Sequence, residues 1–248
     1  MSTEHPTYVY GVLAAPVSEA TGRGIGGAPI RAVTSDGIAA LVSELPEEEL
    51  TFGREEMTTH ARVLEAVLER GTVLPMRFGV VMADAEAVRH DLLEAHRDEL
   101  RRQLTELQGK VELRVRAVYE EQPLMREVLA EDPQLAHQRD QLRNMPPAAA
   151  HFQQIQLGER VARAVEAKRE LDAQQILDAL SPLALTAAVS DPNHERVVLS
   201  ASFLVDVEQL ENFDAAVDQI GRAQADRMRF RYTGPLPPHS FVELHAEA

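Results

Sequence analysis

The chain has 248 residues and a formal net charge of −15, and 44% of its residues are hydrophobic. These proportions are typical of a globular protein, and the length favours two domains over one. The absence of cysteine excludes a disulfide framework, a thiolate metal site and a cysteine nucleophile. Because negative charge repels phosphate groups, we expect no nucleic acid and no membrane among the partners. A cytoplasmic protein that binds other proteins fits these constraints.

The first half of the chain predicts a small sheet. Residues 7–13 are rich in β-branched and aromatic side chains, which is typical of a strand. The pair Asp36-Gly37 favours positive backbone angles between two short apolar runs, so residues 30–34 and 38–43 are expected to form an antiparallel hairpin. Residues 72–76 predict a short edge strand, because a proline at position 75 keeps Leu74 out of the helical region.

Two helices are predicted around that edge strand. Residues 54–70 carry an apolar stripe at spacings of three and four: Met57, Ala61, Leu64 and Leu68. A second, continuous helix is expected to open at Asp84 and run to Gln108. These elements predict a compact N-terminal α+β domain, residues 1–109, with its helices on one face of the sheet.

The second half predicts a different order of elements. Residues 111–119 alternate as a half-buried strand does, whereas the prolines between 120 and 150 indicate an insertion with short helices. A long helix follows, then two strands, a helix and a last strand: 151–180, 183–189, 196–207, 208–225 and 228–232. The order β, α, β, β, α, β predicts a modified ferredoxin-like domain, residues 110–248, with an extended proline-rich C-terminal tail.

Motifs of catalysis and cofactor binding are weak in this sequence. Gly22, Gly24 and Gly27 satisfy G-x-G-x-x-G, but Pro29 and a strand follow where a nucleotide-binding fold needs a helix. No two histidines have the i, i+4 spacing that would present two imidazoles on one helix face. We therefore expect no cofactor, no metal, no catalytic residue and no enzymatic activity.

Two segments are unusual for simple packing. The first, residues 71–79, places Arg77 and Phe78 between a proline and a glycine. The second, residues 232–242, has three prolines within four positions, so the chain must leave its last strand extended and can dock again through Phe241 and Val242. Each segment is either a structural element or a surface for a partner. Arg77, Phe78 and Phe241 are the candidate protein-binding residues.

Both segments, together with the opening residues 8–12, Tyr-Val-Tyr-Gly-Val, resemble signatures of the gas vesicle protein F/L family (GvpF/GvpL). The resemblance continues through residues 60–65 and 158–165, so it covers nearly the whole chain. It implies two α+β domains, the second of a modified ferredoxin-like fold. It does not separate F-type from L-type members.

The resemblance also implies a function. Family members are accessory or assembly components of gas vesicles, the air-filled shells that give cells buoyancy. The implied partners are the hydrophobic shell protein GvpA and other accessory proteins. The expected role is chaperone-like, namely to prevent aggregation during vesicle nucleation, and the expected location is at the vesicle. The alternative is a small-molecule-binding regulatory protein with a ferredoxin-like sensor domain. The turn at residues 120–123 lacks the glycine that would let a ligand approach its backbone, which disfavours that alternative.

Overall fold

The computed structural model describes all residues except 1–4, 18–21, 47–51, 193 and 244–248, and it describes only the backbone of residues 147–149. The chain divides into two compact units. Unit 1 comprises residues 1–113, 204–207 and 234–248, and unit 2 comprises residues 114–203 and 208–233. The C-terminal residues from Gly234 onward thus belong to the same unit as the N-terminal strands.

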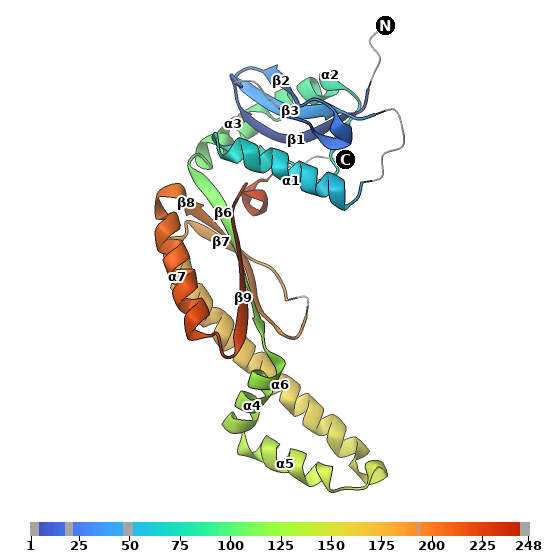
Figure 1. Ribbon diagram of the computed structural model, residues 1–248, viewed down its shortest axis with the longest axis vertical. Helices are drawn as coiled ribbons and strands as arrows, with labels where there is room; N and C mark the ends of the chain where they lie inside the picture. The colour runs from blue at the N-terminus through green and yellow to red at the C-terminus, as the bar shows by residue number, and fades with distance from the viewer. Residues whose placement is uncertain (1–4, 18–21, 47–51, 193, 244–248) are drawn as a thin grey trace. The chain divides into compact units, whose positions relative to one another are not determined.

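The helices and strands largely follow the predicted order (Figure 1). In the N-terminal part they are β1 (Thr7–Ala14), η1 (Ile25–Gly27), β2 (Arg31–Ser35), β3 (Ile38–Glu44), α1 (Arg54–Leu68), β4 (Val73–Pro75), β5 (Val81–Met82), α2 (Ala85–Ala87), η2 (Val88–Glu94) and α3 (Arg97–Glu106). The remaining elements are β6 (Lys110–Tyr119), α4 (Glu121–Glu131), α5 (Pro133–Arg143), α6 (Pro147–Leu180), η3 (Ser181–Leu183), β7 (Thr186–Val189), β8 (Val197–Asp206), η4 (Val207–Gln209), α7 (Leu210–Ala223), β9 (Met228–Leu236) and η5 (His239–Phe241).

The sheet of unit 1 has the order β2-β3-β1-β4, with β5 also paired to β1. Strands β2 and β3 form the predicted hairpin, in which Ser35 pairs with Ile38. Asp36 and Gly37 between them have positive φ angles of 44° and 79°. These angles are what a two-residue turn of the primed type requires.

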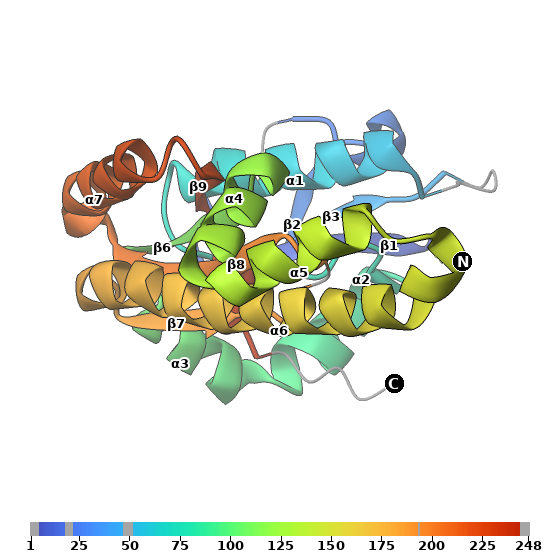
Figure 2. The ribbon, with the colours of Figure 1, turned by 90° about the horizontal axis from the view of Figure 1, so that it is seen from below.

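The expectation that helices cover one face of this sheet is wrong. Side chains alternate along each strand: Tyr8 and Tyr10 of β1 join a cluster with α1, whereas Val9 and Val12 join a second cluster with η2 and α3. Figure 2 shows α1 and α3 on opposite sides of these strands. The sheet is therefore buried on both faces, which is why β1 and β3 are apolar nearly throughout.

The helices of unit 1 also differ in detail from the prediction. In α1 the buried residues are His60, Val63 and Leu64, while Met57 of the predicted stripe is exposed. Asp84 does open the second helical stretch, because its carboxylate accepts a hydrogen bond from the Ala87 amide at 2.8 Å. That stretch is not one continuous helix, however. The π-helical segment η2 ends at Glu94, and α3 begins only at Arg97.

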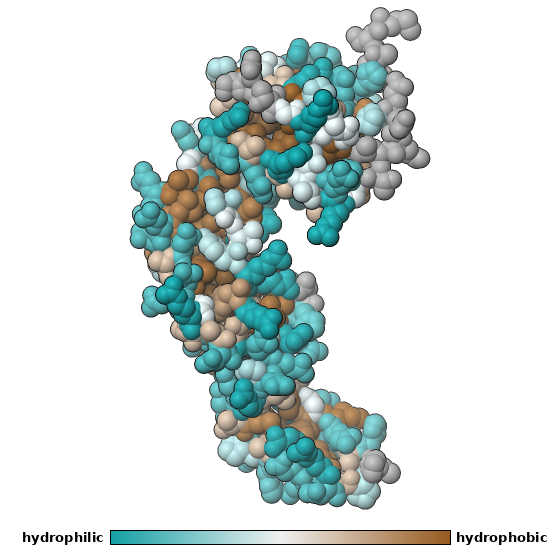
Figure 3. Space-filling model, viewed as in Figure 1, coloured by the Kyte–Doolittle hydropathy of each residue, from teal (hydrophilic) through white to brown (hydrophobic). Residues whose placement is uncertain are grey.

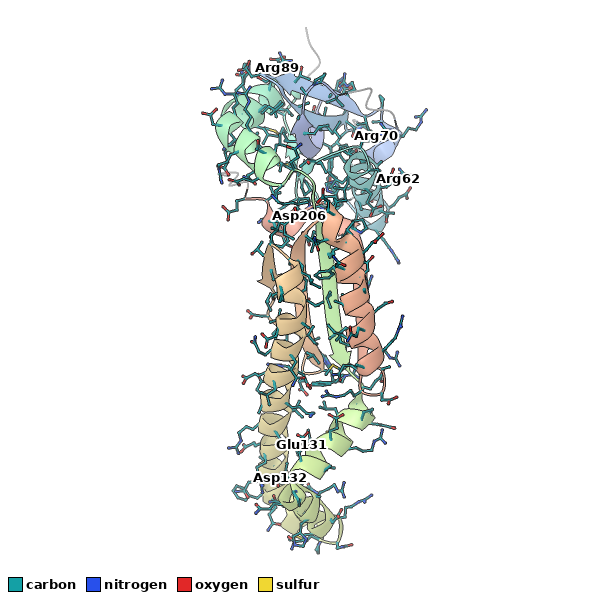
Figure 4. All side chains as sticks on the ribbon, turned by 90° about the vertical axis from the view of Figure 1, so that its left-hand side faces the viewer. Arg62, Arg70, Arg89, Glu131, Asp132 and Asp206 are labelled. Atoms are coloured by element: carbon teal, nitrogen blue, oxygen red, sulfur yellow. The ribbon has the colours of Figure 1, made fainter. Side chains whose placement is uncertain are left out.

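Unit 2 is built on a sheet with the order β7-β8-β6-β9. The long helix α6 and the shorter α7 pack against each other, side by side along this sheet (Figure 4). The proline-containing segment after β6 forms two short helices, α4 and α5, as the prolines indicate. Asp132 caps α5 by accepting hydrogen bonds from the Gln134 and Leu135 amides.

Candidate partner-binding site

The Tyr8 side chain ties together three separate parts of unit 1. Its hydroxyl lies 2.9 Å from Nδ1 of His60 in α1 and accepts a hydrogen bond of 3.0 Å from the Gly79 amide. The first strand, the first helix and the segment that follows β4 thus converge on one buried phenol. Burial raises the pKa of Tyr8 to about 12, so the hydroxyl stays protonated and able to donate.

His60 completes this arrangement as a neutral imidazole. Its side chain is 4% exposed, and burial together with the neighbouring His239 lowers its pKa to about 4. Because Tyr8 already accepts a hydrogen bond from Gly79, its own proton is directed to Nδ1 of the neutral ring. Sequence reasoning assigned no role to His60, and only its position beside an apolar helix stripe hinted at one.

The glycine-rich loop packs on the second tyrosine of β1. The Tyr10 hydroxyl lies 2.8 Å from Oγ of Ser43 and accepts a hydrogen bond of 2.7 Å from the Ile25 amide. A Cβ atom on Gly24 would lie 2.1 Å from that hydroxyl, so only glycine fits. The motif at Gly22, Gly24 and Gly27 therefore has a packing explanation: Tyr10 occupies the space beside its backbone.

Arg77 and Phe78 have opposite surroundings. Phe78 is half-buried, and its ring lies 5.7 Å from that of Phe52 and 5.8 Å from that of His60. Arg77 is exposed and makes no hydrogen bond or ion pair with the part of the chain that the structure describes. Phe52 is itself 39% exposed. An unpaired guanidinium thus lies next in sequence to an aromatic cluster that is partly open to solvent.

Phe241 belongs to a different cluster. It packs, together with Val242, against the cluster that η2 and α3 form with the sheet. The segment is fixed on both sides: Ser240 donates from its amide and hydroxyl to Glu112 at 2.7 and 2.9 Å, and the Gln103 side chain bonds the Glu243 backbone. The C-terminal segment therefore docks again on unit 1, and Phe241 does not join Phe78 in one patch.

Apolar side chains are also exposed on unit 2. Near the start of α6, Phe152 is 68% and Ile155 is 49% exposed, and these residues are one helical turn apart. Figure 3 shows hydrophobic atoms at the surface over this part of α6. Single exposed apolar side chains are common on protein surfaces. Two of them on one helix ridge, however, add to the apolar surface available to a partner.

The described residues offer little for other kinds of site. Among them, no group of three or more histidine, aspartate or glutamate side chains is arranged to hold a metal ion. No helix in the described ranges combines the length and the hydropathy that crossing a membrane would require.

Replacing Tyr8 by phenylalanine should lower the free energy of unfolding of unit 1 by about 1–2 kcal/mol, because the Gly79 amide and His60 lose their partner. Urea unfolding followed by circular dichroism measures this loss. Tyr232 to phenylalanine, at a hydroxyl that bonds exposed Asp214, is the matched control and should change stability less. Equal losses in the two variants would contradict the role given to Tyr8.

Comparison with known proteins identifies the class to which this architecture belongs. The crystal structure of the gas vesicle protein GvpF from Anabaena sp. PCC7120 matches with a TM-score of 0.85 and 27% identity, over 97% of this chain and 99% of that one. The GvpF structure from Microcystis aeruginosa matches with a TM-score of 0.79 and 28% identity, over 96% and 99% of the two chains. The mixed helix and sheet fold thus matches that of the two GvpF structures.

The sequence leads to the same class. Residues 6–243 match the family model described as gas vesicle synthesis protein GvpL/GvpF. A relative named gas vesicle protein F, from a Streptomyces species, is 36% identical over 242 residues, which cover 96% of this chain and 99% of the relative. The chain belongs to the GvpL/GvpF family, which confirms the resemblance inferred from its sequence.

Proposed function

We propose that this protein is an accessory factor of gas vesicle assembly that binds the hydrophobic shell protein GvpA and other accessory proteins. Membership of the GvpL/GvpF family supports a role in gas vesicles. The proposed place of action is the cytoplasm, in association with the forming vesicle. The proposed mode of action is binding, with no catalytic step.

The segment with Arg77 and Phe78, together with Phe52 packed on Phe78, carries this proposal. Aromatic side chains and arginine are enriched where protein interfaces derive most of their affinity. Here the aromatic rings are held in place by Tyr8 and His60, so little side-chain entropy would be lost on binding. An exposed guanidinium without a partner among the described residues is available for a hydrogen bond to another chain. Phe241, which packs inward, is proposed to act only by fixing the C-terminal segment.

Pairwise co-purification tests the proposal. The unchanged protein is expressed with GvpA, or with one accessory protein, in cells that lack other vesicle genes, and capture of GvpA is the expected result. Arg77→Glu should reduce capture at least about tenfold, because the charge at a central contact is reversed. Arg222→Glu is the matched control: this arginine is also exposed, but it lies on α7 of unit 2. Failure of the unchanged protein to capture any vesicle protein would refute the proposal.

Prevention of aggregation is the finer part of the proposed function. A body with a net charge of −15 would keep a bound apolar subunit dispersed through charge repulsion. Light scattering of GvpA, diluted from denaturant with and without this protein, tests the idea. Scattering that rises equally in both samples would exclude a chaperone-like role while leaving the binding proposal open to the co-purification result.

We also propose that the second half is a modified ferredoxin-like domain. The chain order β6-α6-β7-β8-α7-β9 and the sheet order β7-β8-β6-β9 support it, with α4 and α5 as the insertion. The contiguous division into domains 1–109 and 110–248 is likewise a proposal. The alternative, a regulatory protein with a ligand-binding ferredoxin-like domain, predicts thermal stabilisation by a metabolite, which a thermal-shift screen measures.

A further inference from the structure

A hollow of about 700 Å³ lies within unit 1, where β1, α1 and α3 approach one another. Its volume is in the range of protein ligand sites, roughly 300–1,000 Å³. The floor is apolar and buried, made by Leu41, Val63 and Leu104. The half-buried side chains of Leu13, Ile30 and Val67 extend the apolar lining outward.

Three arginines line the same hollow: Arg23, Arg62 and Arg70. All three are exposed, so the hollow opens to solvent at a cationic rim. Arg62 comes from α1 and Arg70 from the turn directly after it, and both lie on the same side of unit 1 (Figure 4). Arg62 and Ala66 are four residues apart on one ridge of α1, and Arg70 follows two residues after the helix ends.

The charges of these arginines are not neutralised within the described residues. The guanidinium groups of Arg62 and Arg70 make no hydrogen bond or ion pair there, and that of Arg23 donates only to the Gly27 carbonyl, at 2.9 Å. None of the lining residues is an aspartate or a glutamate. In a chain with a net charge of −15, this is a local concentration of positive charge next to apolar surface.

Complementarity decides what such a hollow can bind. Guanidinium groups bind carboxylates through paired N–H donors, and an apolar floor favours aliphatic groups. Since the rim is exposed and only the floor is buried, side chains that project from another protein can enter without passing through a tunnel. The charge excludes a cationic occupant and disfavours a purely apolar one.

We propose that this hollow binds a segment of a partner protein that presents a carboxylate beside aliphatic side chains. Arg62 and Arg70 hold the carboxylate, and Val63 and Val67 contact the aliphatic groups. This site rests on the proposed function, because it assumes a protein partner, but it is separate from the surface at Arg77.

Fluorescence anisotropy with two labelled peptides tests the proposal. Both probes are short amphipathic helices of leucine and alanine, one with a central glutamate and the other with glutamine in its place. The glutamate peptide should bind the unchanged protein about tenfold more tightly, a difference typical of a partly desolvated ion pair. In the double variant Arg62→Gln, Arg70→Gln, the two peptides should bind equally weakly.

The matched control is Arg54→Gln, which changes an exposed arginine of the same helix that does not line the hollow. Its preference for glutamate should equal that of the unchanged protein. Circular dichroism and melting temperature verify that both variants fold. Equal binding of the two peptides to the unchanged protein, or no binding of either, would overturn the proposal. An unaltered preference in the double variant would do the same.

A competition experiment distinguishes two possible occupants of the hollow, a protein segment and a free amphiphilic acid. Octanoate carries the same chemical groups, and displacement of the peptide by micromolar octanoate would overturn the choice of a protein segment.

The capture of GvpA in the co-purification distinguishes this proposal from the proposed function. If GvpA is captured but the glutamate peptide has no advantage, only the hollow is excluded. If GvpA is not captured but the glutamate preference holds, the site stands without the proposed function.

Discussion

Replacing Asp172 by alanine is expected to lower the free energy of unfolding of unit 2 by about 3–5 kcal/mol, the typical effect of breaking a buried ion pair from one side. Asp172 of α6 is 6% exposed. Its carboxylate bonds both the Tyr119 hydroxyl and the Arg227 guanidinium, whose Nη1 lies 3.0 Å from Oδ1. These three residues join the end of β6, the C-terminal third of α6 and the segment before β9.

The size of the effect follows from what alanine would leave behind. Arg227 would remain partly buried over the Tyr119 ring, 5.8 Å from its centroid, with Glu127 as its remaining ion partner. Burial and the nearby Asp172 raise the pKa of Tyr119, so its hydroxyl would remain protonated and lose its acceptor. The loss is thus larger than the net contribution of the interaction itself.

Hydrogen exchange of peptides from β6 and α6 measures this prediction. Asp172→Asn retains an acceptor of the same shape and should recover part of the loss. Asp178→Ala is the matched control, because it is an exposed carboxylate of the same helix that accepts only from Gln174. It should change stability by less than about 0.5 kcal/mol. A loss below about 1 kcal/mol for Asp172→Ala would contradict the account of this cluster.

Mild acid should destabilise unit 1 through His60. The pKa of His60 is about 4 in the folded chain, against the ordinary histidine value of 6.5 in the unfolded one. The unfolded state therefore binds the extra proton first, and stability is lost as the pH falls from 6.5 towards 4. The expected loss from this residue is about 2 kcal/mol at pH 5 and about 3 kcal/mol below both pKa values.

Comparing how the stability of each variant depends on pH separates the contribution of His60 from that of the carboxylates. Urea unfolding at a series of pH values between about 7.5 and 5 should show a shallower acid slope for His60→Gln than for the unchanged protein. His90→Gln is the control, because His90 is exposed and Glu94 raises its pKa. Its contribution has the opposite sign: it is present at low pH and lost as the pH rises. Identical slopes for the unchanged protein and His60→Gln would contradict the burial of a neutral imidazole.

Local signals in the sequence were sufficient for most elements. The β2-β3 hairpin was predicted because Asp36-Gly37 has few alternatives to a tight turn, and Asp84 predicted a helix start through its capping carboxylate. The C-terminal segment was correctly expected to dock again through Phe241 and Val242. The expected end of the last strand at Tyr232 was wrong: β9 runs to Leu236 and includes Pro235, which an edge strand tolerates.

The packing between elements was harder to predict from the sequence. The buried face of α1 was predicted only in part. Leu64 is buried and Leu68 packs against the same cluster, but Met57 is exposed and the buried Val63 was missed, because only the sheet decides which stripe is covered. The run of apolar residues in β1, on both sides of the strand, was a signal that both faces of the sheet are buried. That signal was not used when one covered face was predicted.

The candidate site was predicted only in part. Arg77 and Phe78 stood out because a proline and a glycine bracket them, but their supports lie far away in sequence: Tyr8 is 71 residues from Gly79, and 52 from His60. No local pattern encodes such a contact. The arginine-lined hollow could not be predicted either, because it forms only where β1, α1 and α3 meet.

In the proposed function, unit 1 recognises a vesicle protein through the segment that contains Arg77 and Phe78. Hydrogen exchange with and without GvpA, measured by mass spectrometry, tests it most directly. Slower exchange is expected in peptides covering residues 76–82 and the start of α1, with little change in α7. Unchanged exchange throughout unit 1, or protection confined to unit 2, would contradict it.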